Sequence, residues 1–237
     1  LIIGDFTAQI GDASDKQAIR QILSEKEVKE NMKDYVKQIG KILDMKKVEL
    51  HYNGKWLNKL TARDLLNLEM KFTAQQMIHR RNFKERWEQG KAIGIHELNY
   101  PILQGYDSVM VKADIETGGS DQLFNLKTGR EIQQIFNQKP QDIITTKMLN
   151  GLDGRKMSTS WGNVINITDE PNQMYGKIMS MKDELMPEYF ELATQISLTE
   201  TEKIKKELKS KNFNPRDAKA KLAYEIVALY HGKPAAQ

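Results

Sequence analysis

Apolar residues repeat along the chain with two different periods, and this alternation is the first evidence for its fold class. Short apolar runs within residues 1–10 and at residues 143–146 are typical of buried strands. In residues 25–44, apolar positions recur every three to four residues, which predicts an amphipathic helix. Strand patterns that alternate with helix patterns predict an α/β fold with a doubly wound, Rossmann-like sheet.

The same patterns predict the remaining elements and two domains. Strands are expected at 48–52 and 108–115, and helices at 61–72, 73–89, 122–136, 170–181 and 183–194. A capping box at 199–202 opens a lysine-rich helix, and Asn214-Pro215 starts another. The predicted domains are an α/β domain at 1–165, with a helical insertion at about 55–95, and a small α-helical domain at 166–237.

Composition excludes several classes of protein. The chain has 237 residues, 39% of them hydrophobic and 29% charged, as in a globular protein. It lacks an apolar run of about 18 residues, so we expect no membrane contact and a cytoplasmic location. Without cysteine, and with four scattered histidines, the sequence predicts no metal site. The net charge of +4 permits a nucleic-acid partner.

A stripe of hydrogen-bonding side chains is predicted on one helix. Pro101 suits the first turn of a helix, and in such a helix Gln104 and Asp107 lie within about 40° of Tyr100 around the axis. A phenol, an amide and a carboxylate beside apolar residues are costly in a core unless a ligand pairs with them. The sequence therefore predicts a polar pocket, with a boundary helix whose polar face lies in water as the alternative.

Two turns present carboxylates and backbone N–H groups. Residues 117–122 (Thr-Gly-Gly-Ser-Asp-Gln) lie between a predicted strand and a helix, an arrangement that binds anions at the helix N-terminus. Asp12 follows the first strand, where a carboxylate faces the ligand in an α/β fold. Lys16 and Arg20 are four residues apart and would share a helix face, either near a ligand or in water.

Residues 148–163 have the composition of a phosphate-binding loop. The segment holds three glycines, two cations and three hydroxyl groups: Gly151, Gly154, Gly162, Arg155, Lys156, Ser158, Thr159 and Ser160. Glycines let the backbone bend close to a polyanion while the cations point toward it. An ordinary solvated loop is the alternative. The cations of 73–89, namely Arg80, Arg81, Lys84 and Arg86, are expected to face water.

The motif Lys156-Met157-Ser158-Thr159-Ser160, after Gly-Leu-Asp-Gly, resembles the KMSKS signature of class I aminoacyl-tRNA synthetases. Together with Gly-Gly-Ser-Asp-Gln at 118–122, it is most similar to the bacterial tyrosyl-tRNA synthetases. The resemblance implies activation of L-tyrosine by ATP, with Mg²⁺ on the phosphates, and transfer to tRNA(Tyr). It also implies a homodimer formed through the helical insertion.

The resemblance assigns roles to the residues that match the family's motifs. The catalytic charges are Lys156, Lys16 and Arg20. Tyrosine is bound by Asp12, Tyr100, Gln104, Asp107 and Gln122, with Asp107 on the phenolic hydroxyl and Tyr100 and Gln104 on the amino group. ATP is bound by Gly119, Asp121, Met148, Leu149, Lys156, Ser158 and Thr159.

The chain also departs from the family pattern. Thr159 replaces the second lysine of KMSKS, and Glu116 stands where some relatives have glutamine. The HIGH motif and a C-terminal RNA-binding domain are absent, so we expect a fragment. Two alternatives remain open: a tryptophanyl-type relative, or a non-catalytic RNA-binding module. Eight lysines or arginines at 203–221 form either a solvated face or a contact for a phosphate backbone.

Overall fold

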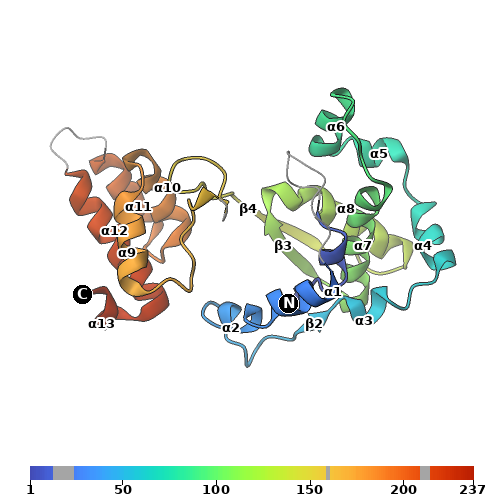
Figure 1. The fold of residues 1–237 in the computed structure, drawn as a ribbon, viewed down its shortest axis with the longest axis horizontal. Coiled ribbons are helices and arrows are strands. Elements are labelled where there is room, and N and C mark those ends of the chain that lie inside the picture. The colour runs from blue at the N-terminus through green and yellow to red at the C-terminus, as the bar shows by residue number, and fades with distance from the viewer. Residues whose placement is uncertain (13–23, 159–160, 209–213) are drawn as a thin grey trace. The chain divides into compact units, whose positions relative to one another are not determined.

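A computed structural model describes residues 1–12, 24–158, 161–208 and 214–237 (Figure 1). The chain packs into two compact units: Leu1–Val36 with Met45–Thr146, and Lys37–Asp44 with Lys147–Gln237. This division falls earlier than the predicted boundary at residue 165. The loop around Lys156 therefore packs within the second unit, and the domain limits 1–165 and 166–237 stay a prediction.

Two pairs of short parallel strands lie in the first unit. β1 (Ile2–Ile3) pairs with β2 (His51–Tyr52), and β3 (Ile115–Gly119) pairs with β4 (Asp142–Thr146). The helix α8 (Leu123–Ile135) connects β3 to β4, because parallel neighbours need a crossover between them. Parallel pairing around a helical crossover confirms the predicted α/β class.

Helices make up most of the rest of the first unit. They are η1 (Thr7–Gln9), α1 (Glu25–Met32), α2 (Tyr35–Ile39, which spans the unit boundary), α3 (Gly54–Leu57), α4 (Ala62–Glu69), α5 (Ala74–Ile78), α6 (Arg81–Glu88), α7 (Ile95–Val111) and η2 (Ser120–Gln122). The single helices predicted at 25–44 and 73–89 were wrong, since each is two shorter helices. Thr73 caps α5, with its hydroxyl accepting from the Gln76 N–H, but the chain leaves helical geometry at Arg80.

The helix α7 is longer than the sequence predicted, at both ends. It begins at Ile95, so Pro101 lies inside the helix and not in its first turn. It continues to Val111 and ends at Lys112, which has a left-handed φ of 52°. The predicted strand at 108–115 was therefore wrong, because Ser108 and Val109 are buried as part of the helix, and β3 starts only at Ile115.

The close packing of α7 against α8 positions the polar stripe (Figure 1). A Cβ on Gly105 would lie 3.0 Å from the Gly129 nitrogen and 2.9 Å from Ile132 Cδ1. Gly105 therefore suits this close approach, because a side chain there would push the helices apart. Ile102 and Val109 of α7 pack with Ile132 in one apolar cluster, which fixes the rotation of α7 about its axis.

The second unit is mainly helical. Its elements are α9 (Pro171–Ser180), η4 (Asp183–Leu185), α10 (Met186–Ala193), α11 (Leu198–Glu207), α12 (Pro215–His231) and α13 (Lys233–Ala236). Met174, Phe190, Leu222 and Ile226 belong to its core. Asn214 caps α12 through the Arg216 N–H, as predicted. The predicted cap at Thr199 was wrong, because Ser197 caps α11 by accepting from the Glu200 N–H.

The start of α7 is held by a buried ion pair from α6. Two nitrogens of Arg86 bind the two carboxylate oxygens of Glu97, with 2.9 Å between Nη2 and Oε1, and both side chains are 6% exposed. Glu97 Oε1 also accepts from the Gly94 N–H at 2.8 Å. The prediction that Arg86 faces water was therefore wrong.

Removing Glu97 should destabilise the first unit strongly, since it leaves the Arg86 charge buried without its partner. We expect Glu97→Ala to lower the free energy of unfolding by about 3–5 kcal/mol in urea denaturation. As a control, Glu88→Ala removes an exposed partner 3.9 Å from Lys84 Nζ and should cost less than about 0.5 kcal/mol. Equal losses in the two variants would contradict this account of α7.

Candidate functional site

The stripe of α7 lies against the N-terminal segment and α8. Tyr100 and Gln104 are half-buried, and Asp107 is buried with 5% of its surface exposed. The helix geometry places Asp107 about 10 Å along the axis from Tyr100. The structure therefore brings the predicted phenol, amide and carboxylate onto one face, with Asp107 at its most enclosed end.

Two neutral donors hold Asp107. Trp56 Nε1 donates to its Oδ1 at 2.7 Å, and Asn53 Nδ2 donates to its Oδ2 at 3.1 Å. Burial raises the pKa of Asp107 to about 7, helped by the negative charges of Glu116 and Asp5 and opposed by the two hydrogen bonds. Asp107 is therefore a carboxylate whose ionisation an additional hydrogen-bond donor would favour.

Asn53 connects Asp107 to the N-terminal segment. Its side chain is fully buried, and its Oδ1 accepts from the Phe6 N–H at 3.0 Å. Its Nδ2 donates to Thr7 Oγ1 at 3.0 Å as well as to Asp107. Its role was not predicted, because the sequence Asn53-Gly54 indicates only a turn.

The amino end of the stripe carries a neutral phenol. Burial, together with the charges of Asp12 and Asp107, raises the pKa of Tyr100 to about 12. Because the Tyr100 hydroxyl stays protonated near neutral pH, it can donate a hydrogen bond without adding a charge to the site.

Asp12 binds an arginine that we had expected in solvent. Arg80 Nη2 donates to Asp12 Oδ1 at 2.7 Å, and Gln122 Nε2 donates to Asp12 Oδ2 at 2.9 Å. Arg80 is 5% exposed, so the prediction that it faces water was wrong. Arg80 was misplaced because the sequence indicated one continuous helix, whereas Arg80 lies at the break between α5 and α6.

The glycine turn between β3 and α8 adds backbone and carboxylate groups. Gly119 pairs with Thr146 at the carboxyl ends of β3 and β4, the edge where open α/β sheets bind ligands. Asp121 and Gln122 follow in η2 and are half-buried. The first unit thus joins Asp12, Gln122 and Gln104 through Asn125 by hydrogen bonds, while Asn53 and Trp56 hold Asp107 separately.

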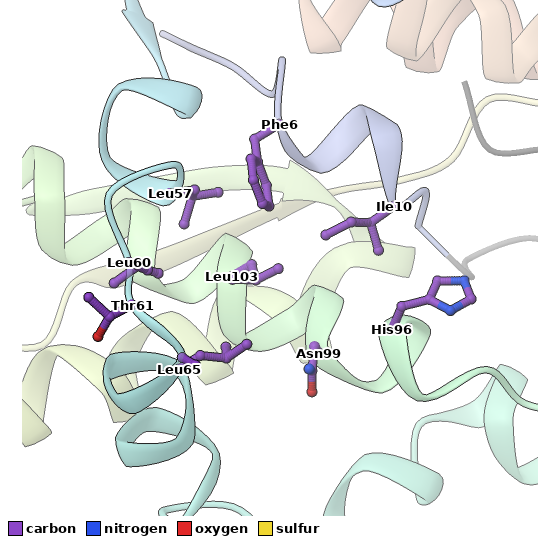
Figure 2. Close-up of a pocket in the computed structure, with 10 residues that line it drawn as sticks. Phe6, Ile10, Leu57, Leu60, Thr61, Leu65, His96, Asn99 and Leu103 are labelled. Atoms are coloured by element: carbon purple, nitrogen blue, oxygen red, sulfur yellow. The ribbon is translucent and has the colours of Figure 1, made fainter. Parts of the chain in front are cut away.

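An apolar cavity of about 220 Å³ lies along a neighbouring stripe of α7. Figure 2 shows Phe6, Ile10, Leu57 and Leu103 pointing into this space. Its lining is mostly hydrocarbon, with Thr61, His96 and Asn99 as the polar residues, and none of the predicted tyrosine-binding residues lines it.

Asn163 organises the glycine loop in the second unit. Its Oδ1 accepts from the Ser158 N–H at 2.8 Å, and its Nδ2 donates to Asp153 at 2.9 Å and to the Lys156 carbonyl at 3.0 Å. A Cβ on Gly151 would lie 2.3 Å from Asn163 Nδ2, so this contact requires glycine.

The remaining predicted residues of the loop differ in exposure. Lys156 is exposed and lies opposite Asn150 in a β-bridge, and Met148 is exposed. Leu149 packs against the core of the second unit. Arg155 binds Asp153 and lies over the Trp161 ring, with 4.5 Å from Cζ to the ring centre. Lys16, Arg20, Thr159 and Ser160 lie outside the described residues.

The described parts of the chain contain neither a cluster of metal ligands nor a membrane-spanning helix. There, no group of three His, Cys, Asp or Glu side chains could hold a metal ion. No helix among the same residues is both long and apolar enough to span a membrane.

Comparison with known proteins identifies the family. The model of the class I tRNA synthetases (W and Y) matches residues 1–237. The chain belongs to this family, and its fold is the Rossmann-like α/β fold of the class I synthetases.

Individual relatives within this family carry the names tyrosine–tRNA ligase or tyrosyl-tRNA synthetase. The chain is 47% identical over 234 residues to the tyrosine–tRNA ligase of Thermotoga maritima, covering 98% of this chain and 58% of that protein. It is 48% identical over 237 residues to that of Carboxydothermus hydrogenoformans, covering 100% and 58%. A C-terminally truncated mitochondrial tyrosyl-tRNA synthetase from Aspergillus nidulans has the same fold, with a TM-score of 0.74, 22% identity, and coverage of 99% and 72%. The chain thus spans about 58% of the length of the two ligases.

The raised pKa of Asp107 should make stability depend on pH. Its ordinary value is 3.8, so folding favours the protonated carboxyl, and this stabilisation is complete below about pH 4 and lost as pH rises to 7. The free energy of unfolding should fall between pH 4 and 8 relative to Asp107→Ala, by at most about 4 kcal/mol. Urea denaturation at several pH values measures this difference. Parallel profiles for the two proteins would contradict the raised pKa.

Removing the Asn163 side chain should loosen the loop. In Asn163→Ala the Ser158 N–H loses its acceptor, so its protection from hydrogen exchange should fall about tenfold, the equivalent of one hydrogen bond. Asn166→Ala, which alters an exposed side chain outside this set of contacts, should leave that protection unchanged. Unchanged protection in Asn163→Ala would show that other contacts hold the loop.

Proposed function

We propose that the protein carrying this chain is a tyrosine–tRNA ligase. The observation that carries the proposal is the buried Asp107, two helical turns from Tyr100 on one stripe of α7. This spacing offers a carboxylate to a phenolic hydroxyl at one end of a tyrosine-sized ligand. It offers Tyr100, Gln104 and Asp12 to an ammonium group at the other end.

The proposed reaction has two steps. An oxygen of the tyrosine carboxylate attacks the α-phosphorus of ATP, forms the P–O bond of tyrosyl-adenylate and releases pyrophosphate. A ribose hydroxyl at the 3′ end of tRNA(Tyr) then attacks the tyrosyl carbonyl carbon, gives up its proton and releases AMP. Neither step requires a covalent bond to the protein, so positioning and charge stabilisation are its contributions.

Each candidate residue has a role in this proposal. Asp12 attracts the ammonium group, with Arg80 and Gln122 fixing its two oxygens. Asp107 accepts a hydrogen bond from the hydroxyl of tyrosine. Gln122 also donates a hydrogen bond to the carboxyl group of tyrosine or to the α-phosphate of ATP. On the ATP side are Gly119, Asp121, Met148, Leu149, Lys156, Ser158 and Thr159, and Lys16 and Arg20 stabilise the leaving pyrophosphate.

Mg²⁺ is proposed to enter with the phosphates of ATP, where it neutralises part of their charge. The described residues provide no carboxylate cluster that would hold the ion independently of the nucleotide. The protein's own cations, Lys156 first among them, supply the remaining charge stabilisation.

Three further assignments belong to the same proposal. The Lys- and Arg-rich segment 203–221 contacts the tRNA backbone, and the protein works in the cytoplasm. The insertion 55–95 forms a homodimer interface. Support for the interface comes from large apolar side chains exposed on α4, at the end of α6 and at the start of α7: Leu66, Met70, Trp87 and Ile95.

Amino-acid-dependent exchange of pyrophosphate into ATP tests the function directly. The protein should exchange pyrophosphate with tyrosine and not with tryptophan or phenylalanine. Exchange driven by tryptophan would establish the tryptophanyl alternative. A protein that binds tRNA without exchange in the presence of any amino acid would establish the RNA-binding module.

Replacing Asp107 should abolish selection for the hydroxyl group. A site that pairs with a substrate hydroxyl rejects the analogue without it by about 10⁵-fold in tyrosyl-tRNA synthetase, the enzyme on which that figure was measured, so we borrow the value. In Asp107→Ala, the ratio of kcat/KM for tyrosine over phenylalanine should collapse. Kinetics of pyrophosphate exchange with each amino acid measure that ratio.

Lys156→Ala is the matched control for this experiment. Its charge acts on the phosphates, so its loss should slow tyrosine and phenylalanine by the same factor and leave their ratio unchanged. If Asp107→Ala also leaves the ratio unchanged, Asp107 is a structural residue and not the specificity group.

A further inference from the structure

Asn150 joins Lys156 to the rest of the second unit. The two residues lie opposite each other in an antiparallel bridge, and beside them the Gly151 N–H donates to the Arg155 carbonyl at 2.7 Å. Hydrogen-bonded and non-hydrogen-bonded pairs alternate along antiparallel strands, so Asn150 and Lys156 form a non-hydrogen-bonded pair. The N–H and the carbonyl of Asn150 therefore point away from Lys156 and need other partners.

The helix α10 supplies those partners. Glu188 Oε1 accepts from the Asn150 N–H at 3.1 Å, and the Tyr189 hydroxyl donates to the Asn150 carbonyl at 2.7 Å. Glu188 Oε2 also accepts from Asn150 Nδ2 at 3.4 Å. Two consecutive residues of α10 thus bind the backbone N–H, the backbone carbonyl and the side-chain amide of Asn150.

The same face of α10 holds the chain before Asn150. Glu191 accepts from Lys147 Nζ at 2.7 Å and from Lys205 Nζ at 2.6 Å. Glu191 and Glu188 are three residues apart, so they share a face of the helix. This face therefore holds both ends of residues 147–150, the segment that leads into the glycine loop.

Apolar packing holds the same segment without fixing its direction. Leu149 and Leu152, on either side of Asn150, pack in the core of the second unit. Apolar contacts are non-directional, whereas hydrogen bonds prefer nearly linear geometry. The bonds from Glu188 and Tyr189 therefore determine how the peptide groups of Asn150 are turned.

We propose that Glu188 is a positioning residue for Lys156, acting through Asn150. By binding Asn150, it keeps that residue in the bridge, and the bridge fixes the backbone from which the Lys156 side chain extends. Opposite residues of a paired segment have Cβ atoms about 5 Å apart on one face, so a shift of Asn150 would move Lys156 with it. This inference rests on the proposed function, in which the charge of Lys156 acts on the phosphates of ATP.

Kinetics of pyrophosphate exchange by the whole protein, with tyrosine saturating, test the proposal. A misplacement of about 1 Å can cost about 100-fold in rate, so Glu188→Ala should lower kcat about ten- to hundredfold. The predicted tyrosine-binding residues lie in the first unit, so the affinity for tyrosine, measured by calorimetric titration, should stay within about twofold.

A second background separates positioning from loss of structure. If Glu188 acts through Lys156, Glu188→Ala should slow exchange by less than about twofold further in Lys156→Ala, because the positioned charge is already gone. Damage to the fold would slow exchange by the same factor in both backgrounds. As a control, Glu184→Ala removes an exposed carboxylate 3.9 Å from Lys182 Nζ and should leave exchange within about twofold.

Two conservative variants test the hydrogen bonds themselves. Glu188→Gln keeps an oxygen for the Asn150 N–H, and the Asn150 amide can turn its own oxygen toward the new NH₂. Exchange should therefore be faster than in Glu188→Ala, within about threefold of the unsubstituted protein. Tyr189→Phe keeps the buried ring and removes one hydrogen bond, so it should slow exchange about three- to tenfold, again without effect in Lys156→Ala. It is the test variant if Glu188→Ala fails to fold.

Each outcome decides a different question. Unchanged exchange in Glu188→Ala, or an equal loss in the Lys156→Ala background, would overturn the positioning role. If the unsubstituted protein exchanges no pyrophosphate with any amino acid, the proposed function fails instead. Hydrogen exchange at the Gly151 N–H then tests the contact itself: protection about tenfold lower in Glu188→Ala would support it, and equal protection would overturn it.

Discussion

The burial of Asp107 on α7 is the constraint on which the rest of the candidate site depends. A carboxylate removed from water is costly, and the protein offsets this cost with two neutral donors, Trp56 and Asn53. Burial raises the pKa of Asp107 to about 7, because the two neutral donors lower it less than the charge of an arginine would. The carboxylate thus retains the capacity to bind one more donor, which the proposed function assigns to the tyrosine hydroxyl.

The first unit places this carboxylate through close backbone packing and a single amide. Gly105 and Gly129 let α7 and α8 approach closely, which brings the stripe of α7 beside Asn125 and Gln122. Asn53 joins Asp107 to the N-terminal segment through Phe6 and Thr7. The opposite ends of the stripe therefore have different electrostatics: Asp12 is paired with Arg80, whereas Asp107 is held by neutral groups.

The sequence was sufficient to group candidate residues that share one helix or one motif. Tyr100, Gln104 and Asp107 share a helix, so the period of 3.6 residues was sufficient to place them together. Trp56 and Arg80 could not be predicted, because their partners lie 51 and 68 residues away in the chain. The strand expected at 108–115 failed because its valines suit a strand locally, whereas packing against α8 keeps Ser108 and Val109 in the helix. The hydrogen bonds from Gln122 to Asp12 and from Asn125 to Gln104 join different elements, which sequence spacing does not contain.

The pH dependence of tyrosine binding tests the central claim most directly. If the ligand hydroxyl binds the ionised Asp107, and its pKa is about 7, affinity should rise about tenfold between pH 6 and pH 8. Asp107→Asn, which cannot ionise, should remove that rise. Titration calorimetry of both proteins at the two pH values measures it. A tyrosine affinity that is flat or falls over this range in the unsubstituted protein would contradict the account.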